Sequence, residues 1–260
     1  MKILFIADIV GKGGRDAVKK LLPELERELE VDFTIANGEH LSDRVGVDEK
    51  IVREMIAGGV DFFTTGNHIW RQKDFASKID TLNLPLIRPA NYVEGTPGEG
   101  YKVVETNFGK LLVINLLGQH EIKAVVGSPF TKADEIIAAH PECKYIFIDF
   151  HAEMSSEKVA LGRYLDGKAS AVVGTHTHVP TADQRVLRGG TATISDVGFT
   201  GPMESVLGVR DDIIFNTFIT SMPQKFELAD GPVQVNAVLV DLGHDGRAKS
   251  IVRVDRVVEL

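Results

Sequence analysis

A pair of histidines separated by one residue is the feature of this sequence best suited to chemistry. His176 and His178 follow a short apolar run, Ala169–Val173, within the segment Gly174-Thr175-His176-Thr177-His178. The small and β-branched residues of the run predict a buried strand that Gly174 ends. Since residues i and i+2 of an extended backbone point to the same side, we expect both imidazoles to reach one metal cluster.

Ligand-type side chains also follow other predicted strands. In chain order these residues are Asp8, Glu39-His40, Asn67-His68 and His151. Any one of them alone would more often be a turn residue or an ordinary polar side chain, and we interpret His120, His140 and His244 in that way. Because the carboxyl ends of parallel strands share one edge of a sheet, where binding sites form, we expect the first group to converge.

The types of these side chains indicate which metals they would hold. They offer carboxylate oxygen, amide oxygen and imidazole nitrogen but no thiolate, a set that suits Fe or Mn, with Zn or Mg as alternatives, rather than a cysteine-bound structural zinc. The set exceeds what one ion needs and divides between two ions if Glu39 bridges them. One ion would take Asp8, Glu39, His40 and His178, and the other would take Glu39, Asn67, His151 and His176.

A pair of divalent ions predicts hydrolysis of a phosphoester. Ions about 3.5–4 Å apart stabilise both the attacking and the leaving oxygen of an in-line displacement at phosphorus. We expect a metal-bound hydroxide to attack. His68 is adjacent to a proposed ligand without being one itself, and we expect it to protonate the leaving oxygen.

Alternating strands and helices would position these residues. The first half predicts a βαβαβ unit with a parallel sheet and right-handed crossovers, and Pro23 predicts a bend or break in its first helix. The expected elements are strand Ile3–Ala7, a helix with Val18–Leu29 on its apolar face, strand Phe33–Ala36, helix Asp48–Ala57 and strand Phe62–Thr65.

The second half predicts further strands and helices. They are the hairpin Tyr101–Thr106 and Leu111–Leu116, helix Thr131–Ala139, strand Tyr145–Phe150, helix Ser155–Leu165, and strands Ala169–Val173, Thr191–Ile194, Val233–Val240 and Lys249–Val254. We expect a two-sheet α/β/β/α sandwich with mixed sheets, parallel strands first and mixed or antiparallel strands later. It would form a single domain over residues 1–260, with a small cap subregion between about 41 and 100.

Composition excludes several classes of protein. The net charge of −8 argues against general nucleic-acid binding. The expected partner is a small phosphodiester substrate, and the formation of a homo-oligomer is left open. A lone cysteine, Cys143, excludes an internal disulfide and fits a reducing compartment. Because no run reaches the roughly 20 apolar residues of a membrane helix, we expect no membrane association and a cytoplasmic location.

The motifs together resemble a known superfamily, the calcineurin-like metallophosphoesterases, whose usual pattern is D-x-H, G-D, G-N-H, a lone H and G-H-x-H. The closer resemblance, over nearly the whole chain, is to the YmdB-type branch of bacterial phosphodiesterases acting on cyclic nucleotides. It is carried by the segments LFIADIVGKGGRD, FTIANGEH, TTGNHIW, IRPANY, IFIDFHAEMSSEK, AVVGTHTHVPTAD and SDVGFTGP.

The resemblance implies a metallophosphoesterase fold and a dinuclear metal-dependent phosphodiesterase. Its substrates would be 2′,3′- or 3′,5′-cyclic nucleotides or related small phosphodiesters. It implies that His68 is the proton donor and that the metal ligands are Asp8, Glu39, Asn67, His151, His176 and His178.

This chain departs from the family pattern at one position. His40 stands where the branch has a ligating asparagine. The branch itself differs from the wider superfamily at two positions. Val10 stands where the superfamily has the D-x-H histidine, and Glu39 stands where it has the bridging aspartate. We infer that His40 supplies the nitrogen ligand that Val10 cannot give.

Two other functions remain to be tested against the structure. A barrel-type metal-dependent amidohydrolase also uses H-x-H, and a non-catalytic or weakly active metal-binding regulatory protein would follow if His40 impaired the site. Five further residues are weaker candidates. Arg88, Asn91 and Thr181 are near enough to the motifs to contact phosphate. Trp70 is placed to stack on a base, and Asp149 to orient a ligating histidine. For the first four, ordinary hydrogen bonding or packing is favoured.

Overall fold

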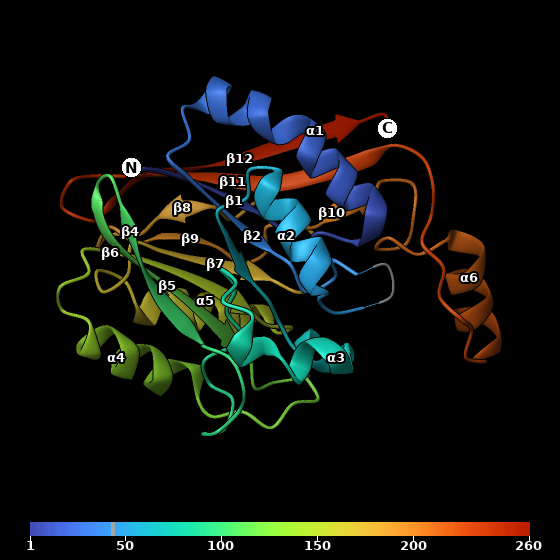
Figure 1. Ribbon diagram of the computed structural model, residues 1–260, viewed down its shortest axis with the longest axis horizontal. Helices are drawn as coiled ribbons and strands as arrows, with labels where there is room; N and C mark the ends of the chain where they lie inside the picture. Colours follow the sequence, from blue (N-terminus) through green and yellow to red (C-terminus); the bar gives the residue numbers. More distant parts are fainter. Residues whose placement is uncertain (43–44) are drawn as a thin grey trace.

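Two mixed sheets packed face to face form the centre of the protein, and helices cover their outer faces (Figure 1). The structure is a computed structural model and describes residues 1–42 and 45–260. This is the α/β/β/α sandwich that the sequence predicts. Because both sheets are open rather than closed into a barrel, the fold excludes a barrel-type amidohydrolase.

The first sheet has the strand order β10-β11-β1-β2-β3, with β12 beside β11. Strands β1, β2 and β3 are parallel, whereas β11 runs antiparallel to β1 and to β12. The bounds are β1 Lys2–Ile6, β2 Phe33–Asn37, β3 Phe62–Thr64, β10 Thr200–Pro202, β11 Val233–Leu242 and β12 Ala248–Val258.

The second sheet has the strand order β4-β5-β6-β7-β9-β8. Its bounds are β4 Tyr101–Thr106, β5 Gly109–Leu117, β6 Tyr145–His151, β7 Ala171–Thr175, β8 Arg185–Val186 and β9 Ala192–Ile194. Strands β5, β6, β7 and β9 are parallel, whereas β4 and β8 run antiparallel to their neighbours, so the second sheet is mixed, as expected for the later strands. Helices α4 and α5 connect β5 to β6 and β6 to β7, and such helical crossovers produce parallel pairs.

Helices α1 and α2 cover the first sheet, and α4 and α5 cover the second. The bounds are α1 Gly11–Leu29, α2 Glu49–Ala57, α3 Lys73–Ala76, α4 Pro129–Ala139, α5 Ser155–Tyr164 and α6 Asp211–Thr220, with 3₁₀ turns η1 Ile69–Arg71 and η2 Ile79–Thr81. In the part of the chain that the structure describes, no helix has both the length and the apolar character needed to span a membrane.

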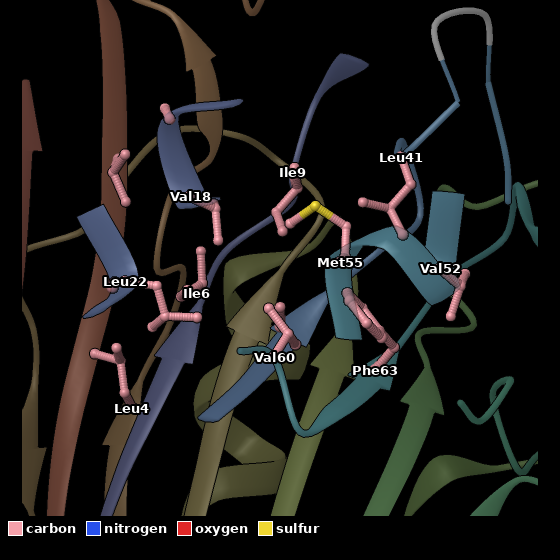
Figure 2. Packing of buried hydrophobic residues seen from close by; sticks show 14 of the residues in the cluster. Leu4, Ile6, Ile9, Val18, Leu22, Leu41, Val52, Met55, Val60 and Phe63 are labelled. Carbon is pink, nitrogen blue, oxygen red and sulfur yellow. The ribbon is translucent and has the colours of Figure 1, made fainter. Parts of the chain in front are cut away.

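Apolar residues alternate between the two faces of β1 and so divide the core into layers. Ile3 and Phe5 face the second sheet, while Leu4 and Ile6 pack under α1 and α2. Figure 2 shows this outer layer, in which the Met55 side chain of α2 reaches between Ile9 and Leu41. A further layer lies between the second sheet and its helices. Burial on both faces explains why the central strands read as continuous apolar runs.

The helices differ from expectation in two places. Helix α1 begins at Gly11 and continues past Pro23 to Leu29, so the expected break is wrong. Pro23 lies on the exposed side of α1, where water can replace the backbone hydrogen bond that proline removes. Helix α6, which we did not expect, projects beyond the sheets (Figure 1) and exposes Phe218 and Ile219.

The interval proposed as a cap contributes to the first layer of the fold. It contains α2 and β3 as well as α3, η1 and η2, and residues 43 and 44 within it lie outside the described residues. The division into a domain and a cap stays a prediction.

Phe147 tests the importance of packing between the sheets. Its fully buried ring lies 5.5 Å from that of Phe5, centroid to centroid. We expect Phe147→Ala to lower the free energy of unfolding by about 3–5 kcal/mol, because it leaves a cavity between two rigid sheets, and Phe147→Leu to cost less. Denaturant unfolding measures both, and a loss below about 1 kcal/mol for the alanine variant would contradict this packing.

Candidate metal centre

The predicted ligands lie together where strands of both sheets end. Asp8 follows β1, Glu39 and His40 follow β2, and Asn67 and His68 follow β3, all in the first sheet. From the second sheet, His151 is the last residue of β6, and His176 and His178 follow β7. The carboxyl ends of parallel strands from two packed sheets thus build one site.

The Glu39 carboxylate lies at the middle of this group and is fully buried. His151 Nε2 lies 2.5 Å from its Oε2, and His68 Nδ1 lies 2.7 Å from its Oε1. Neither contact has the angles of a hydrogen bond, whereas the backbone N–H of His68 does donate to Oε1 at 2.9 Å. Nitrogen and oxygen atoms that crowd together without hydrogen-bond geometry are arranged as ligands around a common centre.

Other distances connect the remaining side chains to this centre. His176 Nδ1 lies 3.0 Å from His151 Nε2, and His178 Nε2 lies 3.6 Å from Asp8 Oδ2. The His40 ring lies 5.2 Å, centroid to centroid, from both the His68 and the His178 rings. Asn67 lines a pocket with His68 and His176.

Buried oxygen atoms without a donor show that the site fits a cation. Asp8 Oδ1, Glu39 Oε2 and Asn67 Oδ1 are buried and have no hydrogen-bond partner among the described residues. Nor does any described lysine or arginine form an ion pair with Asp8 or Glu39. Buried polar oxygens without partners are costly, and bound metal ions would satisfy all three.

The electrostatics of the group agree with this. Burial raises the pKa of Asp8 well above its usual value. Burial would also raise that of Glu39, but His151 beside it holds the Glu39 pKa well below its usual value. Burial alone would lower the pKa of His151, and the Glu39 and Asp8 carboxylates instead raise it to about 9. Protonated His151 therefore takes the place of a cation in the metal-free protein.

Three half-buried histidines of the group, His40, His176 and His178, are held in the form that binds metal. Burial and neighbouring imidazoles lower the pKa of His40 and of His176 to about 3. Burial lowers the pKa of His178 to about 4. Neutral imidazoles have a free lone pair at neutral pH, which is the state required of a ligand.

The backbone of the His-x-His segment differs from the expected extended strand. Strand β7 ends at Thr175, and φ is +101° at His176 and +63° at His178. The expectation that extended i and i+2 positions bring the imidazoles together is therefore wrong. The chain turns at each histidine, with His176 directed to His151 and His178 to Asp8.

A chain of hydrogen bonds orients His151. Its Nδ1 contacts Thr175 Oγ1 at 2.9 Å, and Thr175 Oγ1 donates to Asp149 Oδ1 at 2.7 Å. The hydroxyl proton is used on Asp149, so Thr175 accepts from His151 Nδ1–H and Nε2 is left to face Glu39. Asn37 donates to Asp149 Oδ2 and accepts from the backbone N–H of Glu39. Asp149 thus acts through Thr175, a residue that we had not considered.

Glu153 is a second residue that sequence reasoning missed. Its Oε2 lies 3.1 Å from His176 Nε2, on the ring edge opposite the one that faces His151. A carboxylate in this position fixes the orientation of an imidazole whose other nitrogen binds metal. The only signal for it is its place two residues after His151, in the quoted segment IFIDFHAEMSSEK.

Two pockets flank the site. One, of about 450 Å³, is mostly apolar and lies beside His40 and His178, with Val10, Leu207, Val209 and Phe226 in its wall. The other, of about 560 Å³, is more polar and lies beside Asn67, His68 and His176, with Trp70, Arg71 and Lys123 in its wall. Val10 and His40 therefore share one wall of the site.

Most of the weaker candidates hold the backbone rather than face the site. The Arg88 guanidinium donates to the carbonyls of Pro89, Thr96 and Pro97, and the buried Asn91 amide bonds to Leu117 and Gly127. Thr181 donates to Asp183, and the Trp70 ring packs edge-on against Tyr92. Of these, Trp70 also lines the polar pocket.

Comparison with known proteins identifies the family. A family model described as YmdB-like protein matches residues 4–254. The chain belongs to this family. The resemblance expected from the motifs is therefore confirmed.

Individual proteins and solved structures also match over nearly the full length. A Bacillus subtilis (strain 168) protein named 2′,3′-cyclic-nucleotide 2′-phosphodiesterase is 48% identical over 99% of this chain and 97% of its own length. The crystal structure of a hypothetical protein from Thermus thermophilus has a TM-score of 0.92 at 36% identity and covers 99% of both chains. The structure of a novel phosphatase from Mycoplasma pneumoniae also has a TM-score of 0.92, at 32% identity, over 100% of this chain and 94% of that chain.

Gly66 tests the close approach of backbone to site. A Cβ there would lie 1.6 Å from Glu39 Oε2 and 2.3 Å from His151 Nε2, so we expect Gly66→Ala to displace both side chains and to lose most bound metal. Gly127→Ala is the control, because its Cβ would meet only Asn91 O at 3.7 Å. Elemental analysis of the two folded variants checks this, and equal metal content would contradict the geometry.

Proposed function

We propose that this protein is a phosphodiesterase that hydrolyses cyclic nucleotides at a pair of divalent metal ions. The observation that carries the proposal is the set of buried oxygens without hydrogen-bond partners on Asp8, Glu39 and Asn67. The neutral imidazoles of His40, His176 and His178 belong to the same group. Membership of the YmdB-like family and the name of the Bacillus subtilis relative support the class of reaction.

The geometry favours a division of ligands between two ions. Asp8, His40 and His178 lie on the side of the apolar pocket, and Asn67, His151 and His176 lie on the other side. Glu39 stands between them and would bridge. Nitrogen and oxygen ligands of this kind suit Fe or Mn, with Zn or Mg as alternatives.

The metal ions would supply Lewis acidity at the phosphoryl oxygens and activation of a water molecule. The protein would hold the bridging carboxylate through the backbone N–H of His68, and orient His151 through Thr175 and Asp149. His68, about a quarter exposed, borders the polar pocket. Its Nδ1 faces Glu39, so its Nε2 is the atom that would give a proton to the leaving ribose oxygen.

The polar pocket is the proposed binding place of the nucleotide. Its volume of about 560 Å³ is in the range of small-ligand sites. Arg71 and Lys123 would attract the anionic substrate to a protein of net charge −8. We propose 2′,3′-cyclic nucleotides as substrates, with 3′,5′-cyclic nucleotides and related small diesters as alternatives. A cytoplasmic location also stays a prediction.

His40 favours one alternative function, a weakly active or non-catalytic metal-binding regulatory protein. An imidazole is bulkier than the asparagine amide of the branch, and here it contacts the His68 ring. A histidine at this position that bound metal while blocking substrate would leave only a binding function.

Metal analysis combined with a substrate panel tests the proposal. We expect the purified protein to hold transition metal, and the chelated protein to regain hydrolysis of 2′,3′-cyclic nucleotides when Mn²⁺ or Fe²⁺ is added. The panel should include 3′,5′-cyclic nucleotides and a generic aryl phosphodiester. If the protein binds metal but shows no metal-dependent hydrolysis of any of these substrates, the regulatory alternative is favoured.

The role of His68 can be separated from that of its neighbour. His68 Nδ1 is close enough to Glu39 and His40 to share a metal with them, so geometry allows both proton donation and ligation. We expect His68→Ala to lose most turnover, about 10²–10⁴-fold, while keeping both metals, and Asn67→Ala also to weaken one metal site. Turnover and elemental analysis of each variant are the measurements, and equal metal loss in both would remove the proton-donor role.

A further inference from the structure

The segment that carries His176 and His178 is held in an unfavourable backbone conformation. Both histidines have positive φ, +101° and +63°, a region that residues with a Cβ rarely occupy. Such strained residues persist only where surrounding contacts over-determine them. The contacts that hold the segment therefore decide where its two imidazoles point.

Asp196 supplies two of these contacts, beside the hydrogen bond that the His176 backbone N–H donates to Asp8 Oδ2 at 2.9 Å. Asp196 Oδ2 accepts hydrogen bonds from both the backbone N–H and the hydroxyl of Thr177, at 3.1 and 2.8 Å. Thr177 is the residue between the two histidines. One carboxylate oxygen thus holds the centre of the strained segment at two points.

Lys158 of α5 holds Asp196 in turn. Its Nζ lies 2.6 Å from the same Asp196 Oδ2, and both side chains are almost completely buried. The other oxygen, Oδ1, accepts from the backbone N–H of Gly198 at 2.9 Å. With both oxygens engaged, the carboxylate cannot rotate away from Thr177 without leaving Lys158 as an uncompensated buried charge.

The backbone around Asp196 is fixed as well. Its N–H donates to Thr181 Oγ1 at 2.9 Å, and its carbonyl accepts from the N–H of Thr181 at 3.0 Å. Val197 N–H donates to the Gly174 carbonyl at 2.9 Å. A Cβ on Gly174 would lie 1.8 Å from the Ser195 carbonyl oxygen, so the end of β7 and the Asp196 segment touch backbone to backbone.

We propose that Asp196, anchored by Lys158, is a positioning residue for the metal centre. It acts through Thr177 to hold His176 toward His151 and His178 toward Asp8. This inference deepens the proposed function, and the only part of that function on which it rests is the binding of metal ions at this site. The alternative is that this buried ion pair only stabilises the fold, a role that would not alter metal binding by a folded protein.

Thr177→Val and Thr177→Ser form the matched test. Valine keeps the branched shape but removes the hydroxyl that donates to Asp196, whereas serine keeps the hydroxyl. We expect the valine variant to bind Mn²⁺ roughly tenfold more weakly, the effect typical of losing a contact that orients ligands, and serine to restore wild-type affinity. Both variants should remain folded, since Lys158 and the Thr177 backbone still bind Asp196.

The measurement is titration of chelated protein with Mn²⁺, beside the thermal midpoint of the metal-free protein. Co²⁺ absorption provides a spectroscopic signature of ligand geometry, and we expect the valine variant alone to change it. If the Thr177→Val variant does not fold, Asp196→Asn is the second variant. It leaves the charge of Lys158 uncompensated, and we expect it also to bind Mn²⁺ more weakly.

The outcomes separate this inference from the proposed function. Equal Mn²⁺ affinity and equal Co²⁺ spectra in wild type and a folded Thr177→Val would overturn the positioning role while leaving the function intact. A valine variant whose thermal midpoint falls without loss of affinity would assign the contact to stability alone and also overturn it. A wild-type protein that takes up no metal would instead overturn the proposed function.

Discussion

Two buried carboxylates, those of Asp8 and Glu39, impose the constraint on which the rest of the site depends. Each is fully removed from solvent, and no described lysine or arginine neutralises either one. Burying a charge is tolerated only where a partner compensates it. In the metal-free protein a protonated His151 does so in part, and bound cations would do so more completely. The neutral histidines nearby would then serve as ligands rather than as counter-charges.

The site lies where the two sheets of the sandwich meet, and contacts between the two sheets support it. Asn37 of β2 and Thr64 of β3 both donate to Asp149 of β6, so the support for His151 crosses from one sheet to the other. Arg253 of β12 also donates to the carbonyls of Thr181 and Val197. Thr181 bonds to the backbone of Asp196, and Val197 is the next residue in the chain. The positions of the imidazoles thus depend on the packing between the sheets as well as on each strand.

Much of the fold and the convergence of polar residues could be predicted from sequence. Apolar runs such as Tyr145–Phe150 indicated the strands, and the rule that strand carboxyl ends share an edge placed Asp8, Glu39 and Asn67 near one another. The assignment of each residue as a ligand stays a prediction, although the structure brings the group together. The family, recognised from long motif segments, was confirmed by the matching family model.

What sequence could not predict depends on contacts between distant residues. Thr175 and Glu153 orient histidines only because β6 and β7 pair in a particular register. His176 and His178 have positive φ angles in a segment that Asp196 contacts at Thr177, and Asp196 and Thr177 are 19 positions apart in the chain. Pro23 was misinterpreted because the effect of a proline on a helix depends on which face of the helix meets solvent. Helix α6 was missed because its apolar residues, of which only Ile214 is buried, do not mark a face that packs on the core.

The position of β1 within its sheet has a consequence for biosynthesis. The strand that leads to Asp8 is translated well before β11, residues 233–242, yet one of its edges pairs with β11. Asn236 of β11 accepts the backbone N–H of Ala7, the residue before Asp8. Until that late segment emerges, one side of β1 is an unprotected edge open to wrong pairings. The position of Asp8 is therefore fixed on this side only after β11 has been translated and has paired with β1.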